Sequence, residues 1–222
     1  MKISLIIPTY NEAKNIKEII REAKTYLQDF EHEIIVVDDN SPDKTSLIAL
    51  NEDVIVINRY NKKGLSSAIL EGFEHSNGDI IGVIDADLSH PPNKLPELIR
   101  AVNKCDLVIG SRLVEGGKVE EWTLIRRTIS YIARLLAKPL TPVKDIMSGF
   151  FFIKKSVIQG VDITPRGYKL LLDIIIKGNY QSYKEIPITF RNRKLGQSKL
   201  NLKIQLEYLK QLISLYKYKW FK

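Results

Sequence analysis

Five short apolar runs, separated by segments with helical patterning, constrain the fold of this chain more than any other feature of its sequence. The runs are rich in isoleucine and valine and cover residues 2–7, 33–37, 53–57, 79–84 and 106–109. The segments between them, 12–29, 43–50, 66–76 and 93–103, have the spacing of helices. Near-continuous apolar strands that alternate with helices are typical of a parallel sheet buried on both faces. The sequence therefore predicts an α/β fold with a mostly parallel sheet flanked by helices.

The second half of the chain is less regular. Its patterning predicts a helix over 120–138, a strand over 149–154, a helix over 168–177, a strand over 183–190 and a final helix from residue 201. Because neither a repeat nor a low-complexity linker interrupts the sequence, we expect a single domain over residues 1–222.

Polar residues follow four of the predicted strands at their carboxyl ends. They are residues 8–12 after the first strand, 38–39 after the second, 85–87 after the fourth and 110–112 after the fifth. In sheets of this kind, ligands bind in the crevice beyond the carboxyl ends of the strands. We therefore expect these four segments to meet at one edge of the sheet and to form the functional site.

Asp85 and Asp87 end an apolar strand, where two carboxylates are costly unless positive charge compensates them. A Mg²⁺ or Mn²⁺ ion that bridges them to substrate phosphates would supply that charge. A solvated turn is the alternative interpretation of such a pair.

The consecutive aspartates Asp38 and Asp39 also have two interpretations. Ser41 or Asp43 could cap the following helix by accepting backbone N–H groups. That role leaves the two preceding aspartates unexplained, whereas a nucleotide base or ribose as partner would explain them.

The chain is basic, with 34 lysine and arginine residues, 26 aspartate and glutamate residues and a formal net charge of +8. Residues 193–222 alone hold eight basic residues and one acidic residue. Such a segment attracts nucleic acid, anionic lipid or a phosphorylated substrate. We expect no nucleic-acid partner, because aspartates clustered at strand ends would repel phosphate in the absence of a metal.

The cysteine, histidine and apolar residues of the chain indicate its compartment, its metal ligands and its relation to a membrane. Cys105 is the single cysteine, so we expect no internal disulfide and a reducing compartment. The histidines His32, His75 and His90 do not have metal-ligand spacing. The N-terminus lacks a signal-peptide pattern, and no apolar run approaches the ~20 residues that span a bilayer.

Seven segments, in order, resemble one enzyme family. They are 8–12 (Pro-Thr-Tyr-Asn-Glu), 37–43 (Val-Asp-Asp-Asn-Ser-Pro-Asp), 85–92 (Asp-Ala-Asp-Leu-Ser-His-Pro-Pro), 110–112 (Gly-Ser-Arg), 148–150 (Ser-Gly-Phe), 167–169 (Gly-Tyr-Lys) and 190–200 (Phe-Arg-Asn-Arg-Lys-Leu-Gly-Gln-Ser-Lys-Leu). Together they resemble the inverting glycosyltransferases of family 2, which have the Rossmann-like GT-A fold. Within this family the chain is similar to the dolichyl-phosphate (polyprenyl-phosphate) mannose synthases of the soluble type, without transmembrane helices.

The resemblance implies transfer of mannose from GDP-mannose to dolichyl or polyprenyl phosphate, with inversion and with Mg²⁺ or Mn²⁺. It implies a nucleotide-sugar-binding half, 1–115, and an acceptor- and membrane-facing half, 116–222. It assigns Pro8, Tyr10, Glu12, Val37 and Asp39 to the guanosine, Asp85 and Ala86 to the nucleotide sugar, Asp85, Asp87 and Ser89 to the metal, and Arg112, Arg193 and Lys199 to phosphates. Position 89 often holds glutamine in the family.

In such a transfer, an acceptor oxygen attacks the anomeric carbon as the nucleoside diphosphate leaves. A lipid phosphate is already an anion and needs positioning more than deprotonation. The charge on the leaving group is offset by the metal and by basic residues. The expected catalytic residues are Asp87, Arg112, Arg193 and Lys199, whereas Asp173 is expected to be structural or to orient the acceptor.

The helices predicted over 120–138 and from residue 201 have two interpretations. Their apolar stripes either pack on the domain core or lie at a membrane interface. The stripe of the final helix comprises Leu202, Leu206, Leu209, Ile213, Tyr216 and Trp220. The second interpretation makes the protein cytoplasmic and peripherally associated with the cytoplasmic face of a membrane.

Three other functions stay open from the sequence. The donor could be UDP-glucose or another nucleotide sugar. The acceptor could be a hydroxyl group in polysaccharide synthesis, although the segment 193–199 argues against this. The chain could also be an inactive regulatory subunit, which the intact Asp85, Asp87 and Arg112 make a poor explanation.

Overall fold

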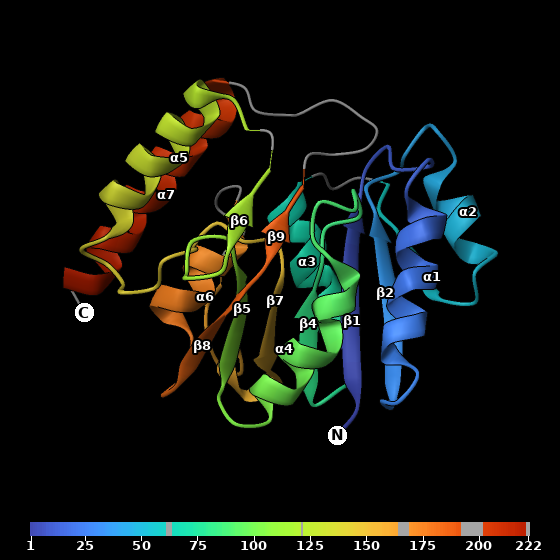
Figure 1. Cartoon of the computed structure of the whole chain (residues 1–222). Helices are drawn as coiled ribbons and strands as arrows, with labels where there is room; N and C mark the ends of the chain where they lie inside the picture. Colours follow the sequence, from blue (N-terminus) through green and yellow to red (C-terminus); the bar gives the residue numbers. More distant parts are fainter. Residues whose placement is uncertain (61–63, 121, 164–168, 192–201, 221–222) are drawn as a thin grey trace.

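The first half of the chain alternates strands and helices as its patterning predicts (Figure 1). The computed structural model describes residues 1–60, 64–120, 122–163, 169–191 and 202–220. The elements of the first half are β1 (Ile3–Thr9), α1 (Ile16–Leu27), β2 (His32–Asp38), α2 (Thr45–Leu50), β3 (Ile55–Asn58), α3 (Leu65–Glu74), β4 (Ile80–Val83), the 3₁₀ helix η1 (Pro92–Lys94), α4 (Leu95–Val102) and β5 (Leu107–Ser111). The predicted strands and helices are confirmed here, with ends that differ by a few residues.

The second half adds the remaining elements. They are β6 (Lys118–Val119), α5 (Leu124–Ala137), β7 (Phe151–Lys154), the 3₁₀ helix η2 (Lys155–Val157), α6 (Leu170–Lys177), β8 (Tyr183–Pro187), β9 (Thr189–Phe190) and α7 (Leu202–Trp220). The single strand predicted over 183–190 is wrong, because β8 pairs with β5 whereas β9 pairs with β6 in a separate two-stranded sheet. The change occurs at Ile188, whose N–H donates to Ser111 and whose carbonyl accepts from Lys118.

The central sheet has the strand order β3-β2-β1-β4-β7-β5-β8. β7 is antiparallel to both of its neighbours, and the other neighbouring strands are parallel, so the prediction of a mostly parallel sheet is confirmed. The aromatic side chains of β7 and of the residue before it need space in the adjoining strands. A Cβ atom at Gly82 of β4 would overlap the ring of Phe152, and one at Gly110 of β5 would crowd Phe150.

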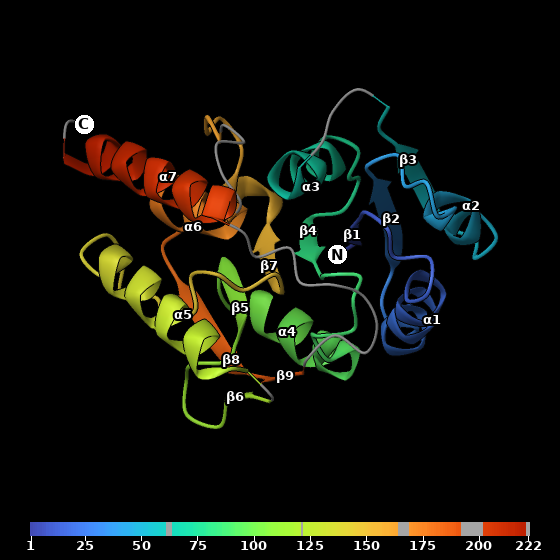
Figure 2. The same ribbon diagram turned by 90° about the horizontal axis from the view of Figure 1, so that it is seen from above.

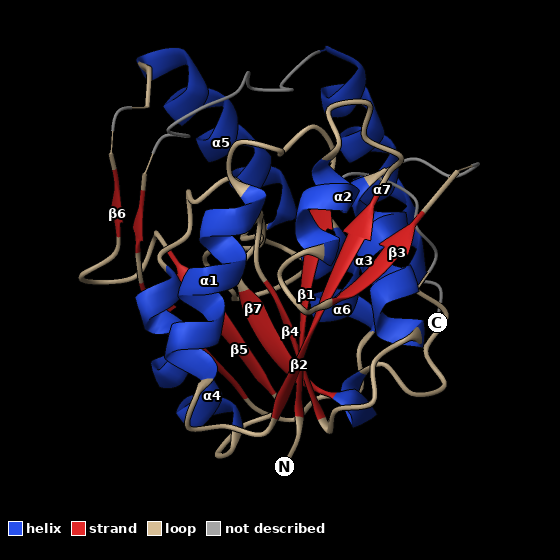
Figure 3. Cartoon of the chain, turned by 90° about the vertical axis from the view of Figure 1, so that its right-hand side faces the viewer, coloured by secondary structure: helices blue, strands red, loops and turns tan. Residues whose placement is uncertain are grey.

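Helices cover both faces of the sheet (Figures 2 and 3). Side chains alternate between the faces of a strand, and β1 shows this clearly. Leu5 belongs to the apolar cluster formed with α1 and α4, whereas Ile6 belongs to the cluster formed with α3 and α6. The sheet is therefore a rigid, doubly covered platform, and the loops at the carboxyl ends of its parallel strands are left to form a site.

α5 and α7 lie side by side at one end of the molecule (Figures 1 and 2). The Tyr208 hydroxyl donates to the Ala133 carbonyl at 2.7 Å and the Tyr216 hydroxyl donates to the Leu136 carbonyl at 2.6 Å. Leu212 and Leu215 of α7 are buried.

Four residues of the predicted apolar stripe of α7 are exposed instead, namely Leu206, Leu209, Ile213 and Trp220, whereas Tyr216 packs against the core. α5 likewise exposes Leu124, Ile125, Tyr131, Ile132, Leu135 and Leu136. The interpretation in which these stripes pack on the core is therefore wrong for these side chains. Among the described helices, none is long and apolar enough to cross a membrane.

Candidate active site

The loops that follow β1, β2, β4 and β5 lie at the same edge of the sheet, because these four strands run in the same direction. The prediction that the four polar segments share one edge is thus confirmed. Within this edge the described side chains form two groups. One surrounds Asp85 after β4 and Arg112 after β5, and the other surrounds Asp38 and Asp39 at the end of β2.

Asp85 is held from two sides. The Nε2 atom of His90 lies 3.3 Å from a carboxylate oxygen of Asp85. His90 is buried, and its ring packs against those of Phe150 and Phe190, with centroids 5.6 and 5.0 Å away. On the other side, a Cβ atom at Gly149 would overlap the Asp85 carboxylate. The sequence indicated no role for His90, because the histidines of this chain do not have the spacing of metal ligands.

Asp87 and Ser89 occupy a tight turn. The Ser89 N–H donates to the Asp87 carboxylate at 3.0 Å, and Leu88 between them has a positive φ of 59°. Both Asp87 and Ser89 are buried. The Ser89 hydroxyl is buried without a hydrogen-bond partner among the described residues.

These residues fit a hard divalent cation. A buried hydroxyl oxygen without a partner next to a carboxylate is a donor set of the kind that Mg²⁺ and Mn²⁺ bind. Within the described ranges, no cluster of three histidine, cysteine, aspartate or glutamate residues could hold a metal by itself. The remaining ligands would therefore come from a phosphorylated substrate and water, as is usual for Mg²⁺.

Arg112 forms a bidentate ion pair with Asp145. Its Nε and Nη2 atoms donate to the two carboxylate oxygens at 2.8 and 2.6 Å, and its backbone N–H donates at 2.9 Å. Burial would raise the pKa of Asp145, but the charge and hydrogen bonds of Arg112 outweigh it and lower that pKa. The guanidinium also lies 5.3 Å from the ring centre of Trp122 and 5.1 Å from that of Phe190. Arg112 is thus a fixed cation, and the sequence did not identify Asp145 as its partner.

Lys169 is a second buried cation near this group. Its ammonium donates to the Met147 carbonyl at 3.2 Å. Burial lowers the pKa of Lys169 to about 8, with the Asp85 charge opposing this shift and the Arg112 charge adding to it. The sequence marked Lys169 only as part of the segment 167–169. The other two residues of that segment lie outside the described residues.

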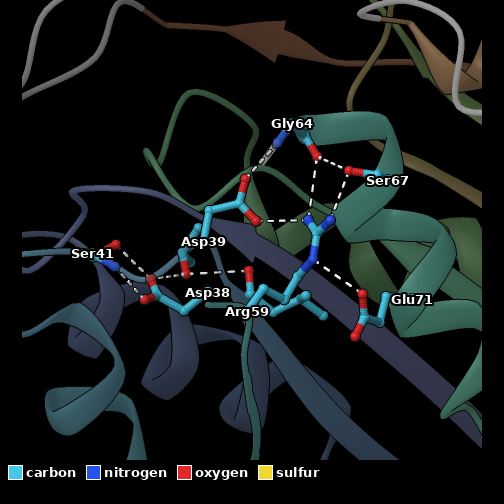
Figure 4. A network of polar contacts seen from close by, with 9 residues as sticks. Asp38, Asp39, Ser41, Arg59, Gly64, Ser67 and Glu71 are labelled. Carbon is cyan, nitrogen blue, oxygen red and sulfur yellow. Dashed lines mark hydrogen bonds and ion pairs between the residues drawn. The ribbon is translucent and has the colours of Figure 1, made fainter. Parts of the chain in front are cut away.

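The two aspartates at the end of β2 both have partners within the protein (Figure 4). Asp38 accepts from the Thr9 hydroxyl at 2.8 Å and from the Ser41 hydroxyl at 2.6 Å. Asp39 accepts from Arg59 Nη1 at 2.6 Å and from the Gly64 N–H at 2.7 Å. Both aspartates thus have partners within the protein, and the assignment of Asp39 to the guanosine stays a prediction.

The interpretation in which Ser41 or Asp43 caps the following helix holds only for Asp43, which accepts from Thr45 at the start of α2, because Ser41 accepts from Asn11 instead. The Ser41 hydroxyl accepts from Asn11 at 2.9 Å, and Asp43 accepts from Ala13 at 3.0 Å and from Thr45 at 3.1 Å. Two of these three bonds reach the loop after β1 rather than α2. They fix the loops after β1 and β2 to each other, next to Asp38 and Asp39.

The other residues assigned from the resemblance lie on or beside these loops. Pro8 is in β1 and Val37 is buried in β2, whereas Tyr10 and Glu12 follow β1 and Ala86 is buried after β4. Arg193 and Lys199 fall outside the described residues.

Asp173 lies in α6 and faces α7. It accepts from the Gln211 side chain of α7 and lies 3.6 Å from the Lys177 ammonium. Burial raises its pKa, and Gln211 and Lys177 oppose this shift.

The architecture is that of a glycosyltransferase. Glucosyl-3-phosphoglycerate synthase from M. tuberculosis matches 98% of this chain and 80% of its own with a TM-score of 0.70 at 20% identity. A structure of that synthase with Mn²⁺, UDP and phosphoglyceric acid matches 98% of this chain and 78% of its own with a TM-score of 0.71 at 18% identity. At such identities the likeness establishes the fold, which is GT-A-like.

The sequence places the chain within one family of that class. Residues 4–161 match the model of glycosyl transferase family 2, and the chain belongs to this family.

Three relatives are similar over most of this chain. Dolichol-phosphate mannosyltransferase of Pyrococcus furiosus is 44% identical over 98% of this chain and 64% of the relative. The enzyme of the same name from Saccharomyces cerevisiae is 35% identical over 99% of this chain and 89% of the relative. Undecaprenyl-phosphate mannosyltransferase of Micrococcus luteus is 34% identical over 90% of this chain and 88% of the relative. The chain therefore spans slightly less than two thirds of the Pyrococcus enzyme.

Proposed function

We propose that this chain transfers a mannosyl group from GDP-mannose to dolichyl phosphate or another polyprenyl phosphate, with inversion at the anomeric carbon. The observation that carries the proposal is the similarity over at least 90% of this chain to three enzymes named as lipid-phosphate mannosyltransferases. These relatives come from an archaeon, a yeast and a bacterium, and their names share the mannosyl group and the prenyl phosphate.

In the proposed reaction, an oxygen of the acceptor phosphate attacks the anomeric carbon, and the bond from that carbon to the GDP oxygen breaks. No proton has to be removed, because the attacking phosphate is an anion at neutral pH. The task of the protein is then to bring two anions together and to stabilise the diphosphate that leaves.

Asp85, Asp87 and Ser89 would hold the divalent cation. When bound, the cation neutralises charge on the departing diphosphate. The carboxylates 85 and 87 would otherwise repel a diphosphate, and the charge of Arg112 is already matched by Asp145. The structures of the M. tuberculosis synthase with Mn²⁺ or Mg²⁺ and UDP support metal use within this fold.

On the protein side, Arg112 provides N–H donors of fixed direction and Lys169 provides a buried ammonium group. The bidentate contact with Asp145 prevents rotation of the Arg112 guanidinium, so its remaining N–H groups keep one direction. From the resemblance, we assign Arg193 and Lys199 to further phosphate contacts.

The α5–α7 pair supports the proposed location at the cytoplasmic face of a membrane. Leu124, Ile213 and Trp220 are 80%, 57% and 65% exposed, which is unusual for large apolar side chains in helices. Exposed basic residues lie on the same two helices or directly after α5, namely Arg127, Lys138, Lys210, Lys217 and Lys219. Apolar side chains together with cations suit an interface of acyl chains and anionic headgroups.

The experiment that tests this function supplies radiolabelled GDP-mannose, GDP-glucose, UDP-glucose or UDP-galactose with Mn²⁺. Each donor is offered with polyprenyl phosphate or with polyprenol, and the lipid phase is then extracted. We expect label in the lipid phase only with GDP-mannose and polyprenyl phosphate. Transfer from a uridine donor would contradict the donor assignment, and transfer to polyprenol would contradict the acceptor assignment. NMR of the product determines the configuration at its anomeric carbon and so shows whether transfer occurs with inversion.

A further inference from the structure

Arg59 is a buried cation to which neither the sequence motifs nor the reaction assign a task. Its side chain is 1% exposed, so it cannot contact a ligand directly. It directs all three nitrogen atoms into the protein (Figure 4). Nη1 donates to Asp39 at 2.6 Å, Nε donates to Glu71 at 3.1 Å and Nη2 donates to the Ser67 hydroxyl at 2.8 Å.

Arg59 connects the end of β2 to the start of α3. The Gly64 N–H, one residue before α3, donates to the second carboxylate oxygen of Asp39 at 2.7 Å. Gly64 has a φ of 130°, a conformation that favours glycine. Each oxygen of Asp39 is thus held by a different donor, and the plane of the carboxylate is defined.

A carboxylate oxygen has two lone pairs, so each oxygen of Asp39 retains capacity for a second donor. Guanine presents two neighbouring N–H groups, N1–H and the exocyclic amino group, at a spacing that a carboxylate accepts from both oxygens. Uracil presents a single N–H group between two carbonyl oxygens, which would repel a second carboxylate oxygen. An oriented and ionised Asp39 is therefore the acceptor pair that distinguishes guanine from uracil.

We propose that Arg59 is the positioning residue for nucleobase recognition, and that it holds Asp39 so that the carboxylate accepts both N–H groups of guanine. This inference rests on the proposed GDP-mannose donor and on the assignment of Asp39 to its guanosine. Burial raises the pKa of Asp39, and the Gly64 N–H and the Arg59 charge oppose this shift. Arg59 thereby also keeps the carboxylate in the form that can accept two hydrogen bonds.

The test compares GDP, IDP and UDP binding by calorimetry with Mn²⁺ present. Inosine diphosphate lacks the exocyclic amino group of guanine but has the same N1–H, ribose and diphosphate, so it reports on a single hydrogen bond. The variants are Arg59→Met, which removes the charge, and Arg59→Lys, which retains it without the planar fork. Arg21→Met is the matched control, since Arg21 pairs with Glu52 on the surface of the molecule.

We expect the wild type to bind GDP about tenfold or more tightly than IDP, the scale of one hydrogen bond to a charged group. In Arg59→Met this preference should fall to about threefold or less, with UDP affinity and the control nearly unchanged. The loss of GDP affinity should be larger at about pH 6 than at about pH 8, because an Asp39 without Arg59 takes up a proton more readily. In Arg59→Lys, the loss of GDP affinity should not vary with pH, because the positive charge is retained. This variant should recover only part of the preference for GDP over IDP.

Two further outcomes separate this inference from the proposed function. A wild type that binds GDP no better than UDP contradicts the donor and removes the basis of the inference. A folded Arg59→Met protein with the wild-type ratio of GDP to IDP affinity at every pH overturns the inference alone and leaves the donor intact. Arg59→Met leaves the buried Asp39 and the partly buried Glu71 without their cation, so the variant could fail to fold. In that case Arg59→Lys decides, and an unchanged GDP-to-IDP ratio in it overturns the inference.

Discussion

At the scale of single residues, the site is built from charges that the protein holds in place before any ligand arrives. Asp85 lies between the His90 ring and the backbone of Gly149, and Arg112 is clamped by Asp145. Side chains fixed in this way cost little reorganisation when charge develops during a reaction.

Gly149→Ala should impair transfer more than it impairs folding. The new methyl group would overlap the Asp85 carboxylate and displace it from His90. A misplacement of about 1 Å near reacting groups costs about 10²-fold in rate, and we expect a loss of that size in kcat. Gly160→Ala is the control, because a Cβ atom there meets nothing within 4 Å, although its φ of 69° adds some strain. Equal kcat values in the two variants would contradict the prediction.

Asp87→Ala should abolish metal-dependent turnover and leave the fold intact. The side chain caps its own turn through Ser89, but the strands of the sheet do not depend on it. We expect kcat to fall by about 10³-fold or more and the response to added Mn²⁺ to disappear. Glu97→Gln, a carboxylate on the surface of α4 paired with Lys94, is the control. Full wild-type activity in excess EDTA would refute the metal requirement.

At the scale of elements, α5 and α7 each bury a few side chains against the core and expose other large apolar side chains. We predict that Ile213→Glu weakens flotation with anionic liposomes by about tenfold, since an exposed isoleucine that enters the interface contributes about 1.5 kcal/mol or more. Leu47→Glu is the control, because Leu47 is similarly exposed but lies on α2, at the other end of the sheet (Figure 1). The same loss in both variants, or none in either, would contradict a membrane-binding role for α5 and α7.

The edge formed by β1, β2 and the turn before β4 should lose stability in acid. Burial would raise the pKa of Glu33, but Lys2, Ser4 and Asn77 outweigh it and lower the pKa to about 2 from 4.5. Because the folded-state pKa is the lower one, ionised Glu33 stabilises the fold above about pH 4.5, and this contribution is lost as the pH falls towards 2.

Glu33→Gln should therefore lower the free energy of unfolding by on the order of 2 kcal/mol at neutral pH and by much less near pH 2. Urea denaturation across this pH range measures the difference. Glu52→Gln tests the opposite case, because Glu52 pairs with the exposed Arg21 and Lys17 and should change stability little. A difference between wild type and Glu33→Gln that does not vary with pH would contradict the assignment of this carboxylate.

At the scale of the whole molecule, the site is formed by the loops after β1, β2, β4 and β5, which span most of the central sheet. Ligand binding should therefore stabilise the entire fold. With Mn²⁺ and GDP at about 100 times the dissociation constant, the stabilisation amounts to about 2.7 kcal/mol. For a chain of 222 residues this corresponds to a rise in Tm of about 5 to 10 °C. We expect the rise with GDP to exceed that with UDP at equal concentration and to be absent with single-stranded DNA. Protection by DNA would revive the nucleic-acid interpretation of the basic charge.

Most of the fold could be predicted from the sequence, because the signals are local. Apolar runs of four to six residues separated by helical spacing predict strands and helices by short-range periodicity, and the topology rule then places ligands at the carboxyl edge. Asp85, Asp87 and Arg112 could be selected in this way, since each lies within a few residues of the end of such a run. The family resemblance extended the selection to Tyr10 and Asp39.

Only the tertiary structure decided which charges meet. Arg112 and Asp145 are 33 positions apart in the sequence, and Asp39 and Arg59 are 20 apart. At such separations, the spacing along the chain does not indicate whether two residues lie close together in space. The same limit applies to β7, which lies between β4 and β5. Gly82 of β4 leaves space for Phe152 of β7, and Gly110 of β5 leaves space for Phe150, the residue before β7. Periodicity showed that α7 has an apolar stripe, but the side of a helix that is buried depends on what packs against it. In this fold Tyr208, Leu212 and Leu215 are buried, whereas Leu206, Leu209, Ile213 and Trp220 of the stripe are exposed.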